Sequence, residues 1–225
     1  MAISHWPKEE RPREKLLLRG ASALSDSELL AIFLRTGLPG ITAIDLARNL
    51  LDEFGGIGPL LSADQDLFCA GKGLGPAKYT QLHACRELTT RYLKEELTDN
   101  PVFTKPSHVR DYLAIQLRDL KREVFVVLLL DTRHQLLYYR EMFQGTIDAT
   151  SVHPREIVRL ALLKDAAAVI VAHNHPSGVA EPSLADIAIT QKIKAALELM
   201  EIRLLDHFII GRGQVTSLAD TGRMG

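Results

Sequence analysis

The sequence predicts a protein of the α/β (α+β) class, in which a small helical domain precedes a mixed-sheet domain with flanking helices. Two observations lead to this fold class. From Ser25 to about Leu93 the apolar residues recur with helical spacing. Beyond about Leu117 the chain changes to short, continuous apolar runs, which are typical of strands buried on both faces and here alternate with amphipathic stretches.

The domain boundary is expected in the stretch KEELTDNPVFTKP, residues 94 to 106. This stretch mixes charged residues with two prolines and has no apolar period. We therefore expect a helical domain over residues 1–100 and a sheet domain over residues 101–225.

Signals for helix starts and stops recur along the helical part of the chain. In SDSELLAIFLRTG, Ser25 and Glu28 have the spacing of a capping box, and Gly37 is the expected stop. In TAIDLARNLLDEFGG, Thr42 is the expected N-cap and Gly55 the stop. These signals predict short helices packed together.

A glycine-rich turn follows these helices. In GKGLGPAKYTQLHACREL, Pro76 suits the first position of another helix, which we expect to run to about Leu93. After the boundary stretch, Ser107 could cap one more helix that ends near Leu117.

After the helix that starts near Ser107, the sheet domain is expected to contain five strands and two amphipathic helices. EVFVVLLLD and QLLYYREMFQG are separated by a short turn, which predicts a hairpin. HPREIVRLALLKD and SLADIAITQKIKAALELM have the spacing of amphipathic helices. The expected strands are 123–131, 135–145, 166–175, 202–211 and 213–218, and the expected helices are 153–165 and 183–200.

The charge of the chain does not support a strongly basic domain. The 225 residues include 27 Lys or Arg and 28 Asp or Glu, a net charge of −1. Residues 1–100 hold 12 basic and 14 acidic residues, and the remainder holds 15 and 14. Binding of nucleic acid without sequence preference needs clustered Lys and Arg, which neither half provides.

The protein is expected to be cytoplasmic and not to associate with a membrane. The N-terminus has no apolar segment of the signal-peptide kind, and no apolar run approaches the roughly 20 residues needed to cross a bilayer. Cys69 and Cys85 are not in a CxxC pair, which indicates two buried thiols and neither a disulfide framework nor a cysteine-based zinc site.

The stretch HNHPSGVAEPSLAD carries the candidate chemistry. His173 and His175 are two residues apart at the end of an apolar strand, so both imidazoles can point the same way. Asp186 lies in the first turn of the next helix and could supply a third ligand. Imidazole and carboxylate ligands together favour a cation such as Zn²⁺ over Mg²⁺ or Ca²⁺.

The same residues allow a purely structural interpretation. Ser183 and Asp186 have the spacing of a capping box, which any helix could use. A histidine at the end of a strand is often only a polar residue that reaches water. The two interpretations are compatible, because a capped first turn would hold Asp186 in place for a metal.

His173, His175, Ser183 and Asp186 match the JAMM motif of MPN-domain metalloproteins, H-x-H, seven residues, S, two residues, D. With VHPRE, LLDHFIIG and the N-terminal PREKLL, LSDSELLAIFLRTG and GLGPAK, nearly the whole chain resembles the RadC (UPF0758) family. The resemblance implies an MPN/JAMM domain with a cytidine-deaminase-like architecture. It also implies one Zn²⁺ per chain, bound by His173, His175 and Asp186.

The resemblance further implies two catalytic residues. Ser183 would stabilise an oxyanion, and Glu123, just before the first core strand, would act as general acid and base. Glu141 and Glu156 are the alternatives for this glutamate. Asp206 and His207 are interpreted as a buried hydrogen-bonded pair rather than a second metal site, and His153 as a residue at a helix start.

The segment DLFCAGKGLGPAKYTQLHACREL resembles a helix-hairpin-helix element. Gly73 and Gly75 would permit a tight turn whose N–H groups could face a phosphate, with Lys72 and Lys78 beside it. These four residues are the candidate contacts to nucleic acid. The alternative is a glycine turn that joins two packed helices, or a surface that recognises protein.

Three functions remain in competition. The first is a zinc-dependent JAMM-type metallohydrolase, a metalloprotease that cleaves an amide or isopeptide bond in an unknown protein or peptide substrate. The second is a DNA-associated accessory protein of repair or recombination, in which the helical domain contacts nucleic acid and the metal domain is regulatory or inactive. The third is a metal-binding module without catalysis.

Overall fold

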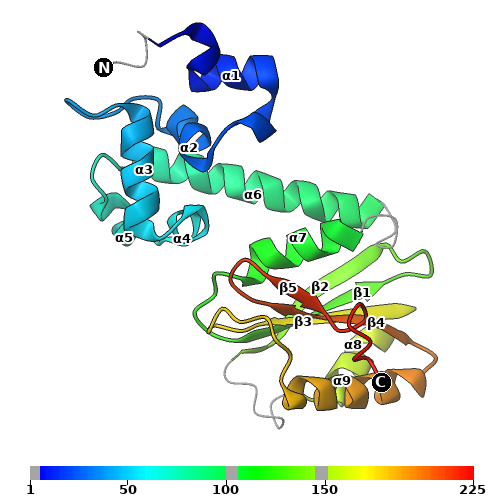
Figure 1. The fold of residues 1–225 in the computed structure, drawn as a ribbon. Coiled ribbons are helices and arrows are strands. Elements are labelled where there is room, and N and C mark those ends of the chain that lie inside the picture. The colour runs from blue at the N-terminus through cyan, green and yellow to red at the C-terminus, as the bar shows by residue number, and fades with distance from the viewer. Residues whose placement is uncertain (1–5, 100–105, 145–151) are drawn as a thin grey trace. The chain divides into compact units, whose positions relative to one another are not determined.

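The computed structural model describes residues 6–99, 106–144 and 152–225. Contacts divide the chain into two compact units, Met1–Leu88 and Thr89–Gly225. The boundary expected between residues 100 and 101 lies outside the described residues, as does Gly145 at the end of one expected strand. The molecule is helical first and then builds a mixed sheet flanked by helices, as the predicted fold class requires (Figure 1).

The first unit consists of short helices around one apolar core, which includes Leu34, Ile44, Leu50, Leu60 and Phe68. Its elements are η2 (Lys8–Glu10), α1 (Pro12–Arg19), η3 (Ala21–Ala23), α2 (Asp26–Leu34), α3 (Ala43–Phe54), α4 (Ile57–Ser62), α5 (Gln65–Ala70) and the beginning of α6 (Pro76–Asp99).

The predicted helix caps in this unit are confirmed. Ser25 and Glu28 form both hydrogen bonds of a capping box at α2. Thr42 caps α3 by accepting from the N–H of Asp45, and α3 ends at Gly55 in the left-handed conformation. These signals were readable because each involves residues within one turn of a helix.

The predicted stop at Gly37 is wrong. Helix α2 ends at Leu34, because Arg35 adopts a positive φ of 66° and the helix cannot continue through it. Gly37 is needed for another reason. A Cβ atom at this position would collide with the carbonyl oxygen of Ile41, where the chain folds back on itself.

Helix α6 is longer than expected. It starts at Pro76 as predicted but continues past Leu93 to Asp99. Leu93 and Leu97 lie on one helix face and are buried in the core of the second unit, and this burial carries the helix through a polar stretch. Helix α7 (Pro106–Leu117) begins one residue before the expected cap, so Ser107 lies inside the helix.

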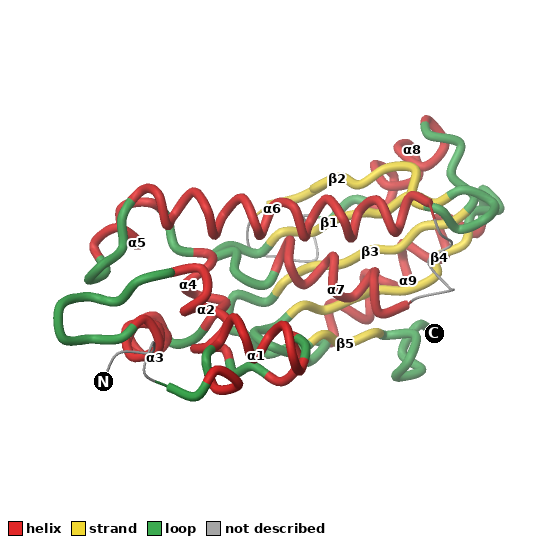
Figure 2. The backbone as a smooth tube through the Cα atoms, turned by 90° about the horizontal axis from the view of Figure 1, so that it is seen from above, coloured by secondary structure: helices red, strands yellow, loops and turns green. Residues whose placement is uncertain are grey.

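The second unit is built on five strands: β1 (Val124–Leu130), β2 (Leu136–Gln144), β3 (Ala168–Asn174), β4 (Arg203–Ile210) and β5 (Val215–Ser217). They are ordered β2-β1-β3-β4-β5 (Figure 2). β1 is antiparallel to β2 and β3, β3 is parallel to β4, and β4 is antiparallel to β5, which confirms the mixed sheet and the hairpin.

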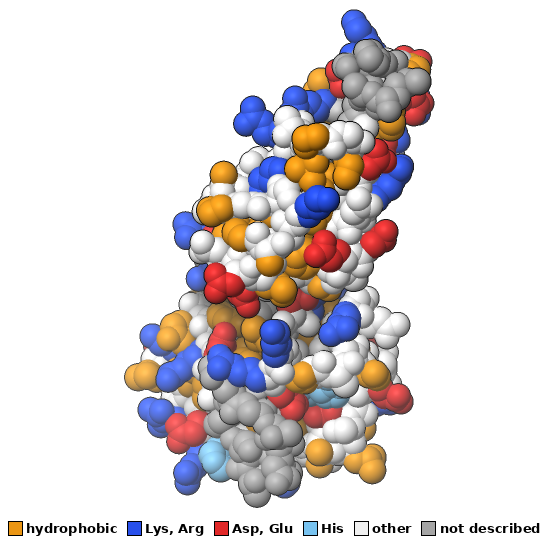
Figure 3. Space-filling model, turned by 90° about the vertical axis from the view of Figure 1, so that its left-hand side faces the viewer, with side chains coloured by type: hydrophobic (Ala, Val, Ile, Leu, Met, Phe, Trp, Pro, Cys, Tyr) orange, Lys and Arg blue, Asp and Glu red, His pale blue; other side chains and the backbone are white. Residues whose placement is uncertain are grey.

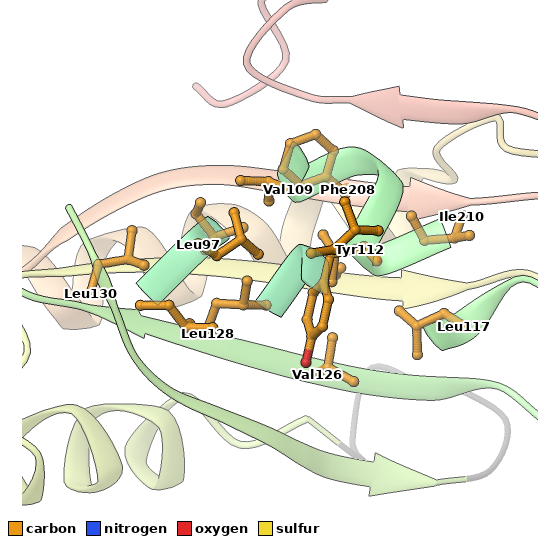
Figure 4. Packing of buried hydrophobic residues seen from close by; sticks show 14 of the residues in the cluster. Leu97, Val109, Tyr112, Leu117, Val126, Leu128, Leu130, Phe208 and Ile210 are labelled. Atoms are coloured by element: carbon orange, nitrogen blue, oxygen red, sulfur yellow. The ribbon is translucent and has the colours of Figure 1, made fainter. Parts of the chain in front are cut away.

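Both faces of the sheet are covered, and this explains the apolar runs of β1 and β3. One face packs against α7 and the end of α6, in a cluster that includes Leu97, Tyr112, Val126 and Phe208 (Figure 4). The other face packs against α8 (Pro154–Leu163) and α9 (Leu184–Glu198) (Figure 1). Every residue of β1 and β3 is buried.

Two remaining expectations concern the membrane and the cysteines. None of the helices in the described part of the chain is both long and apolar enough to cross a membrane. The prediction of two buried thiols is wrong for Cys85, which is exposed on α6, whereas Cys69 is partly buried. Residue 85 of α6 is exposed, which a lone cysteine in the sequence does not reveal.

Candidate metal centre

The two histidines of the HNH stretch lie at the end of β3. His173 is fully buried on the sheet face that packs against α9, with Phe125 of β1 opposite it. His175 follows the last residue of the strand and is partly exposed. Their Nε2 atoms are 2.9 Å apart, so the imidazoles converge as the i, i+2 spacing predicts.

Asp186 reaches the same point from the first turn of α9. Its carboxylate oxygens lie 3.2 Å from Nε2 of His173 and 3.5 Å from Nε2 of His175. The aspartate is almost fully buried. Ser183 caps the helix, and its backbone N–H and hydroxyl both donate to Oδ2 of Asp186 at 2.7 Å. The capping box therefore orients the carboxylate toward the histidines.

The hydrogen bonds of His175 fix which nitrogen faces the site. Its Nδ1–H donates to the carbonyl oxygen of Val179 at 2.8 Å. A neutral imidazole carries only one N–H, so the Nε2 lone pair of His175 points at His173 and Asp186. Two ring nitrogens and a carboxylate facing one another repel unless a cation or a proton lies between them.

The donor set fits a small cation with tetrahedral preference. Ligand atoms bound to zinc at roughly 2.0–2.1 Å in a tetrahedron are about 3.3 Å apart. The separations among His173, His175 and Asp186 are 2.9, 3.2 and 3.5 Å. The His and carboxylate side chains brought together here could therefore hold a metal ion.

Glu123 lies beside this group, directly before β1. Its carboxylate is 3.8 Å from Nε2 of His173. Glu123, His173 and His175 can each bring one donor atom within 4.8 Å of the others. Asp186 is nearer to His173 than Glu123 is, and the roles of Asp186 as a ligand and of Glu123 as a proton acceptor stay predictions.

The two alternative glutamates have different surroundings. Glu141 is exposed on β2. Glu156, on α8, accepts from Arg159 at 2.9 Å, and this hydrogen bond holds the pKa of Glu156 below its ordinary value. The catalytic assignment of Glu123 stays a prediction, and its position beside the histidines is what favours it.

The charges at the site shift the pKa values of its groups. The hydrogen bond to Asp186 raises the pKa of His175 above its ordinary value, against the opposing effect of burial. Burial acts to raise the pKa of Asp186, but the interactions of its carboxylate with the side chains of His173, His175 and Ser183 outweigh this effect, and the pKa falls well below its ordinary value. A cation in the place of the shared proton would be stabilised by the same carboxylate.

The predicted hydrogen bond between Asp206 and His207 is present, but it runs through the main chain: the backbone N–H of His207 donates to Oδ1 of Asp206 at 2.7 Å, and Asp206 is only partly buried. Neighbouring residues of a strand point to opposite faces, so the two side chains have different partners. Asp206 accepts from the hydroxyl of Ser217 at 2.6 Å and from backbone N–H groups. His207 is fully buried, with Nε2 at 2.9 Å from Nδ1 of His173, and burial lowers its pKa strongly.

Asn174, between the two histidines, is a residue that the sequence reasoning missed. It points to the other face, where Oδ1 accepts from the backbone N–H of Val124 at 2.8 Å. Its Nδ2 donates to the carbonyl of Arg122 at 3.0 Å. An amide in a buried strand end was the available signal, because such a group needs several hydrogen-bond partners.

Ser183 and His153, two further residues predicted from the sequence, both stand at helix N-caps. Ser183 is exposed, and its hydroxyl donates to Asp186, so a role toward an oxyanion stays a prediction. His153 stands at the N-cap of α8, the helix-start position expected for it. The space-filling view shows histidine side chains at the surface directly beside acidic ones in the second unit (Figure 3).

The glycine turn of the first unit is braced from within. Gly73 has a positive φ of 79°, and Lys78 donates to the Gly73 carbonyl at 2.6 Å. Lys72 is exposed, and Gly75 accepts from the N–H of Lys78 at the start of α6. Basic and acidic side chains are interspersed on the face shown in Figure 3. A DNA contact at this turn stays a prediction.

Comparisons with known proteins agree with these two units. Residues 103–223 match a family model described as a RadC-like JAB domain, and residues 3–80 match the UPF0758 N-terminal family. UPF0758 proteins of Marinomonas sp. (strain MWYL1) and Tolumonas auensis are both 61% identical over 222 residues. A UPF0758 protein of Aeromonas hydrophila is 57% identical. Each alignment covers 99% of both chains.

Proposed function

Because the chain belongs to the RadC (UPF0758) family and carries its JAB domain, we propose that it is a zinc-dependent hydrolase of the JAMM type. The bond cleaved is an amide or isopeptide bond, which makes the protein a metallopeptidase. The observation that carries the proposal is the convergence of His173, His175 and Asp186 within 2.9–3.5 Å, with Glu123 beside them.

The proposed ligand set leaves one position open. Three protein ligands plus a water are typical of catalytic zinc, whereas structural zinc takes four protein ligands. When bound there, a zinc ion supplies Lewis-acid activation of water and carbonyl groups. Because His175 is partly exposed and Ser183 is exposed, a substrate has access to that side.

The chain's own residues have distinct tasks in this mechanism. Glu123 takes a proton from the attacking water and delivers it to the leaving amine nitrogen. Ser183 turns its hydroxyl from Asp186 toward the carbonyl oxygen of the substrate, which becomes an oxyanion when the water attacks the carbonyl carbon, a role worth roughly 3 kcal/mol at comparable sites. Asp186 keeps the cap hydrogen bond from the N–H of Ser183 throughout.

The test combines metal analysis with a peptide-cleavage screen. Wild type should bind one zinc per chain and cleave a peptide or isopeptide substrate, and Glu123→Gln should keep the zinc and lose turnover. Glu141→Gln and Glu156→Gln are matched controls that should retain activity. Purified wild type that binds no stoichiometric zinc would contradict the proposal, and so would full turnover by Glu123→Gln.

A further inference from the structure

We propose that His207 and Thr190 are positioning residues that fix the tautomer of His173 and so keep its Nε2 lone pair available to a metal. The inference rests on the proposed function only in that the metal is the expected occupant of the site. His207 on β4 and Thr190 on α9 both lie outside the JAMM motif.

The three side chains form a buried row through the second unit. His173 comes from β3, His207 from the parallel neighbour β4, and Thr190 from α9. His207 pairs with Val171 in the sheet register, so it points to the same face as His173. All three residues are fully buried. Phe125 lies against both rings, with centroids 6.1 Å from His173 and 5.6 Å from His207.

The hydrogen bonds along this row run in one direction. The hydroxyl of Thr190 donates to the backbone carbonyl of Asp186 at 2.5 Å. A hydroxyl has one proton, so toward Nδ1 of His207, at 2.6 Å, Thr190 can only accept. Nδ1 of His207 therefore carries the proton.

The protonation of His207 in turn determines which ring nitrogen of His173 carries a proton. A neutral imidazole has one N–H, so Nε2 of His207 is an acceptor for Nδ1 of His173, at 2.9 Å. His173 consequently carries its proton on Nδ1 and presents a lone pair on Nε2. The carbonyl of Asp186 thus determines, through two side chains, the state of the histidine that faces the Asp186 carboxylate.

The opposite direction would inactivate the site. If Thr190 donated to His207, the proton of His207 would sit on Nε2 and that of His173 would move to its own Nε2, among the ligand atoms. The carbonyl of Asp186 would then lose the hydroxyl donor and keep only the helical N–H of Thr190. The helix that supplies the aspartate ligand therefore also selects the ligating tautomer of His173.

The test uses Thr190→Val, which keeps the shape and removes the acceptor, with Thr190→Ser as the matched control that keeps the hydroxyl. Loss of a hydrogen-bond partner of a metal-binding histidine typically weakens metal affinity about 10–100-fold. We expect that range for Thr190→Val and for His207→Phe in zinc competition with a chelator, and a much smaller change for Thr190→Ser. Circular dichroism checks that each variant is folded.

A second measurement does not depend on zinc or on the folding of any variant. Long-range ¹⁵N–¹H NMR of the histidine rings in metal-free wild type should show His173 and His207 protonated at Nδ1. A His173 ring without a proton on Nδ1 would overturn the inference, and so would unchanged zinc affinity in folded Thr190→Val. Wild type that binds no zinc but shows the Nδ1 tautomers would contradict the proposed function alone.

Discussion

Asn174 holds the chain beside Glu123, since its side-chain oxygen accepts the backbone N–H of Val124 at 2.8 Å. The amide nitrogen of Asn174 donates to the carbonyls of Arg122 and Leu120 at 3.0 and 3.2 Å. These bonds lie on both sides of Glu123 in the sequence. One strand end thus supplies the two histidines and also anchors the segment that carries the proposed general base.

Asn174→Ala should lower turnover and stability while zinc remains bound. The variant leaves the buried N–H of Val124 without its partner, which costs about 1–3 kcal/mol. Urea unfolding, zinc content and peptide cleavage measure the three quantities. Asn174→Asp, which keeps the acceptor for Val124 and loses the donor, should be intermediate in stability. Wild-type turnover and stability in Asn174→Ala would show that the anchor is unimportant.

The two roles of Asp186 should be separable. Asp186→Asn keeps an oxygen that can accept from Ser183 but loses the negative charge, so we expect the helix to remain and zinc affinity to fall at least tenfold. Ser183→Ala removes the cap, at about 1 kcal/mol of unfolding free energy. Its metal site should remain occupied at saturating zinc. Calorimetric zinc titration with thermal unfolding compares both variants, and equal zinc affinity in Asp186→Asn and wild type would argue against a ligand role.

Metal-free protein should lose stability as the pH rises through the pKa of His175. The pKa of this histidine is raised in the folded state by the hydrogen bond to Asp186. A raised pKa contributes stability that is complete below the unfolded pKa of about 6.5 and is lost above the folded one. Unfolding free energies between pH 5.5 and 9, compared with His175→Gln, measure this contribution.

Zinc should remove that pH dependence, because the metal replaces the proton among the same donor atoms. Zinc affinity should accordingly increase with pH over the range in which His175 loses its proton, with proton release on binding. Calorimetry in buffers of different ionisation enthalpy counts the protons. A zinc affinity independent of pH across this range would contradict the shared site.

Binding of DNA by the helical unit, the competing function, can be tested at the glycine turn. Lys72→Ala combined with Lys78→Ala should weaken binding and flatten its dependence on salt if these side chains contact phosphates. Lys78 also donates to the carbonyl of Gly73, so its replacement alone should destabilise the turn. Lys72→Ala, at an exposed position, isolates the electrostatic effect. A gel shift without binding by wild type at low salt would exclude the contact.

Much of this molecule could be predicted because its signals are local. The capping boxes of Ser25–Glu28 and Ser183–Asp186 each lie within one helical turn. The apolar runs of β1 and β3 predict strands buried on both faces, and in the structure both strands lie inside the sheet. His173 and His175 are two residues apart in the sequence, so their convergence needed only the alternation of a strand.

Tertiary contacts decided the rest. Helix α6 continues to Asp99 because Leu97 packs into an apolar core formed with strands that are distant in the sequence. Asp206 and His207 separate because the sheet has two different faces, and His207 meets His173 only because β4 lies beside β3. The sequence by itself determined which residues could hold a metal. Only the packing of β4 and α9 against β3 brought His207 to Nδ1 of His173 and Thr190 to His207, because these hydrogen-bond partners lie far away in the chain.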